Sequence, residues 1–221
     1  MTTADRTLKR RAIMTIVRQF GRPRGIPGQV AGWIMAHRRS NQQRNRWAVA
    51  QLEPRPTDRV LEIGFGPGLA IAELAQRAHQ GHVYGIDHSE VMVRQASRRN
   101  QAAIRAHRVE LVQASVDQLP SFDEPLDMIL AVNSIGFWAD PVETLRGLRR
   151  LLRPGGRIAL VTQPRCPGAT RDTTTQAAQG LQDLLTQAGF ARFRVETLDL
   201  DPPVACVLAT NPADENHHTH G

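Results

Sequence analysis

A glycine-rich turn in VLEIGFGPGLAIAEL, residues 60–74, combines residue types and spacing that could bind a ligand. A short apolar stretch carries the acid Glu62, and Gly64, Gly66 and Gly68 follow at alternate positions before a helical pattern begins. Glycine tolerates positive φ and lets a ligand approach the backbone, while the first turn of a helix offers unpaired N–H groups. The pattern favours a nucleotide-like ligand over a tight turn that binds nothing.

Two common nucleotide-binding loops do not fit this turn. The dinucleotide fingerprint needs a small residue three positions after its second glycine, and Leu69 stands there. No Gly-Lys-Ser/Thr follows, which excludes a phosphate-cradling loop. A second acid, Asp87, ends the next apolar stretch, 19 residues after Gly68. There a carboxylate can accept hydrogen bonds from both hydroxyls of a ribose, or it can cap the following helix.

These residues need a sheet that brings strand ends together. From residue 59 onward short apolar stretches alternate with helical patterns of roughly 10–18 residues, which indicates an α/β fold with a doubly wound, mostly parallel sheet. Near the end, two stretches are joined only by Leu200–Pro203, and a turn that short requires an antiparallel pair. The predicted strands are Val60–Ile63, His82–Ile86, Val109–Gln113, Leu126–Val132, Arg157–Thr162, Phe193–Leu198 and Val204–Ala209, and the predicted helices are Leu69–Ala78, Ser89–Ala106, Pro141–Leu152 and Thr173–Ala188.

The string Glu-x-Gly-x-Gly-x-Gly from Glu62 to Gly68 resembles motif I of class I S-adenosylmethionine-dependent methyltransferases, of the general small-molecule (type 11-like) family. Further signals follow in the family's order, among them LDMILAVNSIGFWADP and LRRLLRPGGRIALV, and together they cover residues 59–162. The resemblance implies a seven-stranded Rossmann-like sheet ending in an antiparallel hairpin. It also implies S-adenosyl-L-methionine as the cofactor and S-adenosyl-L-homocysteine as the product.

The same resemblance implies roles for single residues. Asp87 would bind the ribose, and His88 would pack on the adenine or stay exposed. The family carries an Asp near the adenine after its third strand; Ser115 stands there instead, so the backbone N–H of Val116 would carry more of that recognition. Residues 133–138 would face the transferring methyl group, and Gly155 and Gly156 would only reverse the chain. The predicted cofactor-binding residues are Glu62, Gly64, Gly66, Gly68, Asp87, His88, Ser115, Val116 and Asn133.

Basic charge is concentrated in the N-terminal quarter. Residues 1–59 hold 13 Lys and Arg against 3 Asp and Glu, whereas residues 60–221 hold 15 against 18. In isolation the segment HRRSNQQRNRW, residues 37–47, looks like a nucleic-acid-binding arm. In the methyltransferases that the chain resembles, a helical cover over the methionine end of the cofactor takes this place. We therefore predict a helical cap at 1–57, a cofactor-binding domain at 58–210 and a mobile tail at 211–221.

The cap is expected to build the acceptor pocket. A capping box at Ser40 and Gln43 would open a helix that runs to about Leu52. Within 38–46, an arginine or asparagine would hold the cofactor carboxylate or an acidic acceptor, and His37 is a candidate general base or else an exposed polar residue. The predicted pocket residues are Trp33, His37, Trp47, Phe137 and Trp138.

Three functions remain open: a methyltransferase for a small-molecule O, C or N nucleophile, an RNA or protein methyltransferase that uses the basic segment, and a non-catalytic cofactor-binding module. Nucleic acid is disfavoured because no appended RNA-binding module is visible. Cys166 and Cys206 lack metal-ligand spacing, so we expect no metal site but two reduced thiols in a cytoplasmic protein. No apolar run approaches the roughly 18 residues that span a bilayer. The amphipathic stretch Leu8–Phe20 could touch a membrane, its own domain or a second subunit of a homodimer.

Overall fold

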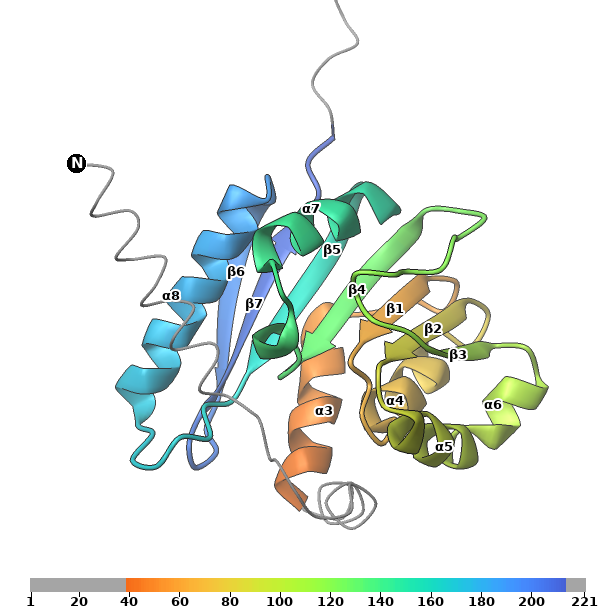
Figure 1. Cartoon of the computed structure of the whole chain (residues 1–221), viewed down its shortest axis with the longest axis horizontal. Helices are drawn as coiled ribbons and strands as arrows, with labels where there is room; N and C mark the ends of the chain where they lie inside the picture. The colour runs from red at the N-terminus through yellow and green to blue at the C-terminus, as the bar shows by residue number, and fades with distance from the viewer. Residues whose placement is uncertain (1–38, 214–221) are drawn as a thin grey trace, which may run out of the picture.

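A computed structural model describes residues 39–213, and its centre is a sheet of seven strands in the order β3-β2-β1-β4-β5-β7-β6 (Figure 1). Strands β1 to β5 run parallel, and β7 is antiparallel to both β5 and β6. The predicted parallel core with a C-terminal antiparallel hairpin is therefore confirmed. The strands are β1 (Arg59–Ile63), β2 (His82–Asp87), β3 (Val109–Gln113), β4 (Leu126–Val132), β5 (Leu152–Thr162), β6 (Ala191–Leu198) and β7 (Val204–Thr210).

Helices cover both faces of this sheet because its central strands are apolar on both sides. Val60 and Met128 pack toward one group of helices, whereas Leu61 and Ile129 pack toward the other. The first group is α3 (Arg39–Leu52), α4 (Leu69–Arg77), α5 (Glu90–Arg99) and α6 (Gln101–Arg105), and the second is α7 (Pro141–Leu151) and α8 (Arg171–Gln187), with a short 3-10 turn η1 (Ile135–Phe137) before α7. None of the helices within residues 39–213 has the length and apolar character to cross a membrane.

Helix α3 belongs to the core of this domain. Ala48, Val49 and Leu52 are fully buried against α4 and the strands beneath it. The predicted capping box is wrong, because Arg39 is already helical and Ser40 lies inside the helix. The division into 1–57, 58–210 and 211–221 stays a prediction, and most of the first region lies outside the described residues.

The predicted helix Ser89–Ala106 is in fact two helices that meet at Asn100. The Asn100 side chain is buried, and its Nδ2 donates to the carbonyls of Ala96 at 2.9 Å and Gly68 at 3.2 Å. Asn100 ends α5 and precedes α6, and its backbone (φ −103°, ψ 16°) is outside the α-helical range. The prediction of one uninterrupted helix was therefore wrong, and the break ties α5 to the turn.

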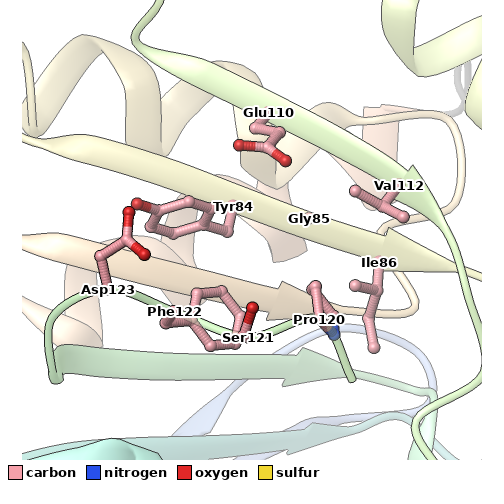
Figure 2. A pocket seen from close by; sticks show the side chains of 9 residues that line it. All are labelled: Tyr84, Gly85, Ile86, Glu110, Val112, Pro120, Ser121, Phe122 and Asp123. Carbon is pink, nitrogen blue, oxygen red and sulfur yellow. The ribbon is translucent and has the colours of Figure 1, made fainter. Parts of the chain in front are cut away.

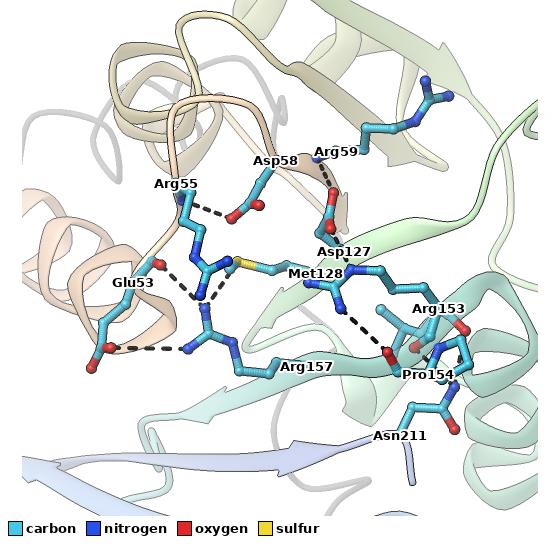
Figure 3. Close-up of polar contacts among 11 residues, drawn as sticks. Glu53, Arg55, Asp58, Arg59, Asp127, Met128, Arg153, Pro154, Arg157 and Asn211 are labelled. Carbon is cyan, nitrogen blue, oxygen red and sulfur yellow. Dashed lines mark hydrogen bonds and ion pairs between the residues drawn. The ribbon is translucent and has the colours of Figure 1, made fainter. Parts of the chain in front are cut away.

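Strand β5 begins five residues before the predicted start at Arg157. The Arg-Pro-Gly-Gly segment is not a free turn, because the N–H of Gly155 donates to Asn211 O and the N–H of Asn211 donates to Gly156 O, both at 2.8 Å. Figure 3 shows the surrounding polar contacts, including Asp127, which accepts from the Arg59 backbone N–H at 2.8 Å and from Arg153 Nε. These contacts hold together the amino ends of β1, β4 and β5, opposite the ends that carry the glycine turn.

Asn211, directly after β7, binds the amino end of β5, although the sequence analysis placed it in a mobile tail. It is buried, and its Nδ2 lies 2.9 Å from Leu152 O, 3.2 Å from Arg153 O and 3.3 Å from Arg149 O. The ordered domain therefore extends at least to Asn211.

Replacing Asn211 with alanine is expected to lower the free energy of unfolding by about 2 kcal/mol, because buried carbonyls lose their donor. Asn211→Asp keeps the volume but cannot donate, so it is expected to cost at least as much. Urea denaturation followed by circular dichroism measures both. If both variants stayed within about 0.5 kcal/mol of wild type, as ordinary surface substitutions do, the side chain would have no such role.

Candidate active site

The glycine turn lies at the point where the strand order reverses. From β1 the sheet extends through β2 to β3 on one side and through β4 to β5 on the other. Ligands of open α/β sheets bind in the crevice outside the carboxyl ends of the strands at this point. The turn, the end of β2 and the end of β4 therefore form the candidate site.

Gly64 and Gly66 serve different structural roles in the turn. Gly64 has φ +72°, and an added Cβ would lie 2.5 Å from Ser134 Cβ at the end of β4. Gly66 has φ +52°, and a Cβ there would meet no atom of residues 39–213 within 4 Å. Gly64 thus lets β1 and β4 pack, whereas Gly66 leaves an open surface of backbone for a ligand.

Asp87 is fixed at the tip of β2 by two backbone donors. Its buried carboxylate accepts from the N–H of Gly66 at 2.8 Å and from the N–H of Ser89 at 2.9 Å, one on each oxygen. The helix cap is Ser89, whose Oγ accepts from Met92 N, so Asp87 does not serve the capping role that was its alternative. Each oxygen keeps a second lone pair for a ligand hydroxyl.

Glu62 is the second buried acid of the site. No group within residues 39–213 hydrogen bonds its Oε2 atom. Burial raises the pKa of Glu62 well above its usual value, the negative charge of Asp87 raises it further, and a hydrogen bond from the Ile71 backbone opposes both. An unpaired buried carboxyl oxygen beside an open glycine turn is the kind of group that a polar ligand completes.

Two aromatic rings flank the crevice from opposite sides of the switch point. His88 follows β2, and Phe137 lies in η1 after β4, with the ring centroids 6.4 Å apart. Phe137 is 55% exposed, which is unusual for a phenylalanine. Ser115 and Val116 stand in the loop after β3, where Ser115 Oγ contacts only Asp117 among the groups of residues 39–213. The Gln113 side chain donates to His88 O at 3.3 Å and so joins the two loops.

Comparisons with known proteins agree with this geometry. The family described as a methyltransferase domain matches residues 60–156. An uncharacterized methyltransferase of Bacillus subtilis, YdaC, is 32% identical over 185 residues, which are 83% of this chain and 99% of the relative. The chain belongs to the class I S-adenosylmethionine-dependent methyltransferases.

Two further proteins resemble this methyltransferase over smaller shares. A ubiquinone/menaquinone biosynthesis C-methyltransferase of Geotalea daltonii is 29% identical over 117 residues, 52% of this chain and 50% of the relative. The crystal structure of an S-adenosylmethionine-dependent methyltransferase from Aquifex aeolicus has a TM-score of 0.60 at 21% identity, covering 75% of this chain and 88% of that one. The second likeness concerns the fold alone.

The residues of this methyltransferase fit the cofactor that its family uses. Gly66 leaves open space, Asp87 is rigidly held with free lone pairs, and Glu62 has an unpaired oxygen. A ribose needs acceptors for two hydroxyls, and a methionine ammonium needs an acceptor or a carboxylate. We infer that Asp87 would hold the ribose and Glu62 the amino end.

The predicted pocket residues separate into different environments. Trp138 is buried in the core between η1 and α7, so Phe137, its neighbour, is the one that stands at the crevice. Trp47 belongs to α3, is half-buried and packs against the core between this helix and the sheet. Trp33 and His37 lie outside the described residues.

Asn133 connects two strand ends in the methyltransferase. It has φ +53°, and its Oδ1 accepts from the N–H of Gln163 at 2.7 Å. Asn133 was predicted to bind the cofactor, but in the structure its side chain holds the end of β5 beside the end of β4. Ser134 lies in the stretch 133–138 that was predicted to face the methyl group, but its buried Oγ donates to Ile63 O at 2.8 Å and its Cβ lies under Gly64, a packing role that the sequence analysis missed. No local pattern marks it, because its partner is 71 positions away.

A separate hollow lies on the sheet face between β2, β3 and the loop 119–123. Figure 2 shows Tyr84, Phe122 and Pro120 among its lining residues, with Glu110 and Asp123 at its rim. Residues within β2 and β3 form one wall and the loop forms the other, and the Tyr84 and Phe122 rings pack edge to face with centroids 5.0 Å apart. The loop covers this face in place of a helix, and the hollow is distinct from the crevice at the strand ends.

The raised pKa of Glu62 gives a testable pH dependence. The folded protein keeps a proton on Glu62 above pH 4.5, the usual value, while the unfolded chain releases it. The folded state therefore binds more protons, and this residue makes stability fall as pH rises from about 4.5 through the raised pKa. Glu62→Gln mimics the neutral acid, so its advantage in free energy of unfolding is expected to grow with pH. Urea titrations from acidic to neutral pH measure it, and parallel curves for the two proteins would contradict the prediction.

Proposed function

We propose that this enzyme transfers the methyl group of S-adenosylmethionine to a small-molecule acceptor with an oxygen, carbon or nitrogen nucleophile by in-line displacement. The observation that carries the proposal is the convergence of the glycine turn, Asp87 and Glu62 at the switch point, next to the exposed ring of Phe137. The C-methyltransferase of ubiquinone/menaquinone biosynthesis among its relatives supports a small organic acceptor.

The cofactor supplies a methyl group on a sulfonium, which is already a good leaving group. The protein's task is then to align the two reactants and to exclude water, and orientation alone can contribute several kcal/mol. Asp87 and the glycine turn fix one end of the crevice, while the ends of β4 and β5, joined through Asn133 and Gln163, form the wall on the other side of the switch point. Phe137 offers an apolar surface there for an acceptor.

The described part of the basic segment favours a small molecule over RNA. Arg44 is buried and its Nη1 donates to Gln163. Arg46 points to solvent, and its Nε lies 3.8 Å from Glu73 Oε2. A phosphate-binding arm needs several exposed, unpaired cations in a row. Of the three arginines among residues 39–47 only Arg39 and Arg46 are exposed, and Arg46 lies near an acid, so they do not form such a row.

Two measurements test the proposal on the full-length protein. Isothermal titration should show binding of S-adenosylmethionine, and no binding at millimolar ligand would exclude both a small-molecule and a macromolecular methyltransferase. A panel of phenols, quinones, amines and carboxylates should then release S-adenosylhomocysteine with at least one acceptor. Release only with RNA or protein, with a steep dependence on salt in the case of RNA, would support the macromolecular function instead.

A further inference from the structure

A buried arginine that pairs with no acid among residues 39–213 lies at the carboxyl ends of β4 and β5. Arg44 on α3 is 6% exposed, and within residues 39–213 it forms no ion pair with an acid. Its Nη1 donates to Gln163 Oε1 at 2.6 Å, and its Nε has no hydrogen-bond partner among the same residues. Burying a charge without a counter-charge is costly, and a structural tie between α3 and β5 needs no charge.

A second guanidinium group stands beside the first. Arg165 follows the end of β5, is exposed, and donates from Nη2 to Asn41 Oδ1 on α3 at 2.9 Å. Burial and the positive charge of Arg165 lower the pKa of Arg44 to about 10, so Arg44 remains charged near neutral pH. Two like charges held this close favour binding of an anion between or beside them.

The amide that contacts Arg44 is itself held in place. Gln163 donates from Nε2 to Pro202 O at 2.8 Å, and its backbone N–H donates to Asn133 Oδ1. The Gln163 amide oxygen is therefore directed at Arg44. Such prior ordering lowers the entropic cost of binding a ligand at this corner.

The position of this corner indicates which ligand reaches it. Asp87 and the glycine turn lie at the ends of β1 and β2, where the adenosine is expected, whereas Arg44 and Arg165 lie at the ends of β4 and β5. The corner is thus on the acceptor side of the switch point. A guanidinium fork matches a carboxylate in shape as well as charge.

We propose that Arg44 and Arg165 bind a carboxylate of the acceptor, so that the substrate is a small organic acid. This rests on the proposed function, since it assigns the ends of β4 and β5 to the acceptor. Arg165 is the accessible member of the pair, and Arg44 is the inner, preorganised one.

The test compares carboxylates with their amides. Three pairs serve as probes: 3,4-dihydroxybenzoate, phenylacetate and hexanoate, each against its primary amide, titrated with and without saturating S-adenosylhomocysteine. In wild type at least one acid is expected to bind about tenfold more tightly than its amide, as a charge-assisted contact provides. Arg44→Gln and Arg165→Gln are expected to remove most of that preference, and Arg46→Gln, the exposed neighbour on the same helix, to preserve it.

Several outcomes would overturn the proposal. They are the absence of any acid preference in wild type, a preference that survives Arg44→Gln, or an Arg44→Gln protein that loses affinity for S-adenosylhomocysteine, which would assign Arg44 to the cofactor's own carboxylate. If Arg44→Gln does not fold, Arg165→Gln becomes the deciding variant. An unchanged preference for the acid over its amide in Arg165→Gln would overturn the proposal. Failure of the proposed function is seen separately, as no binding of S-adenosylmethionine by wild type, while the acid preference is still measured without cofactor.

Discussion

Replacing Gly64 with alanine is expected to lower the free energy of unfolding by about 3–5 kcal/mol and the melting temperature by roughly 10 °C. Two effects combine. Gly64 has φ +72°, a region that costs an alanine about 1–2 kcal/mol. The new Cβ would also lie 2.5 Å from Ser134 Cβ, so the ends of β1 and β4 would have to separate. Differential scanning calorimetry measures the change.

Gly66→Ala is the matched control for this variant. Gly66 also has positive φ, but its Cβ would point into open space, so a loss of only about 1 kcal/mol is expected. If the open space holds the cofactor, Gly66→Ala should instead weaken binding of S-adenosylmethionine. Equal destabilisation by the two substitutions would show that contact with Ser134 does not matter.

Removing the carboxylate of Asp87 is expected to weaken binding of S-adenosylmethionine by about a hundredfold or more, since hydrogen bonds to a charged group contribute roughly 1.5–3 kcal/mol each. Asp87→Ala removes the acceptor that holds the N–H of Gly66 and, in the proposed site, the contacts to the ribose. Isothermal titration with S-adenosylmethionine measures the affinity, and circular dichroism checks that the sheet is retained.

Asp87→Asn separates the two contributions. The amide keeps one oxygen acceptor but turns its NH2 toward a backbone donor, so an intermediate loss of affinity is expected. Glu90→Gln is the control, because Glu90 is an exposed acid at the start of α5, three residues after Asp87, and pairs only with Arg94 among the described residues. Cofactor affinity in Asp87→Ala within about threefold of wild type would remove Asp87 from the site.

The sequence was most informative where the relevant neighbours are close along the chain. The strand ending near Asp87 and the turn from Gly64 to Gly68 follow from alternating and helical spacings that span only a few residues. The antiparallel hairpin followed from a short connection, which permits no other pairing. Those local patterns were enough to predict the sheet and to indicate the methyltransferase family.

Local sequence patterns could not predict contacts between segments that lie far apart along the chain. The single helix predicted across Asn100 was wrong because its partner, Gly68 O, is 32 positions away. Asn211 was assigned to the tail because the carbonyl groups that it contacts, near Leu152, lie 58 to 62 positions earlier in the sequence.

The segment HRRSNQQRNRW shows the same division. By itself the sequence placed four arginines near the start of the domain and predicted a helix, but it could not distinguish Arg44 from Arg46. Tertiary structure buries Arg44 against Gln163 and leaves the Arg46 side chain 77% exposed. The physical reason is that the sequence determines a helix's own periodicity, whereas the sheet against which it packs determines which side of that helix is buried.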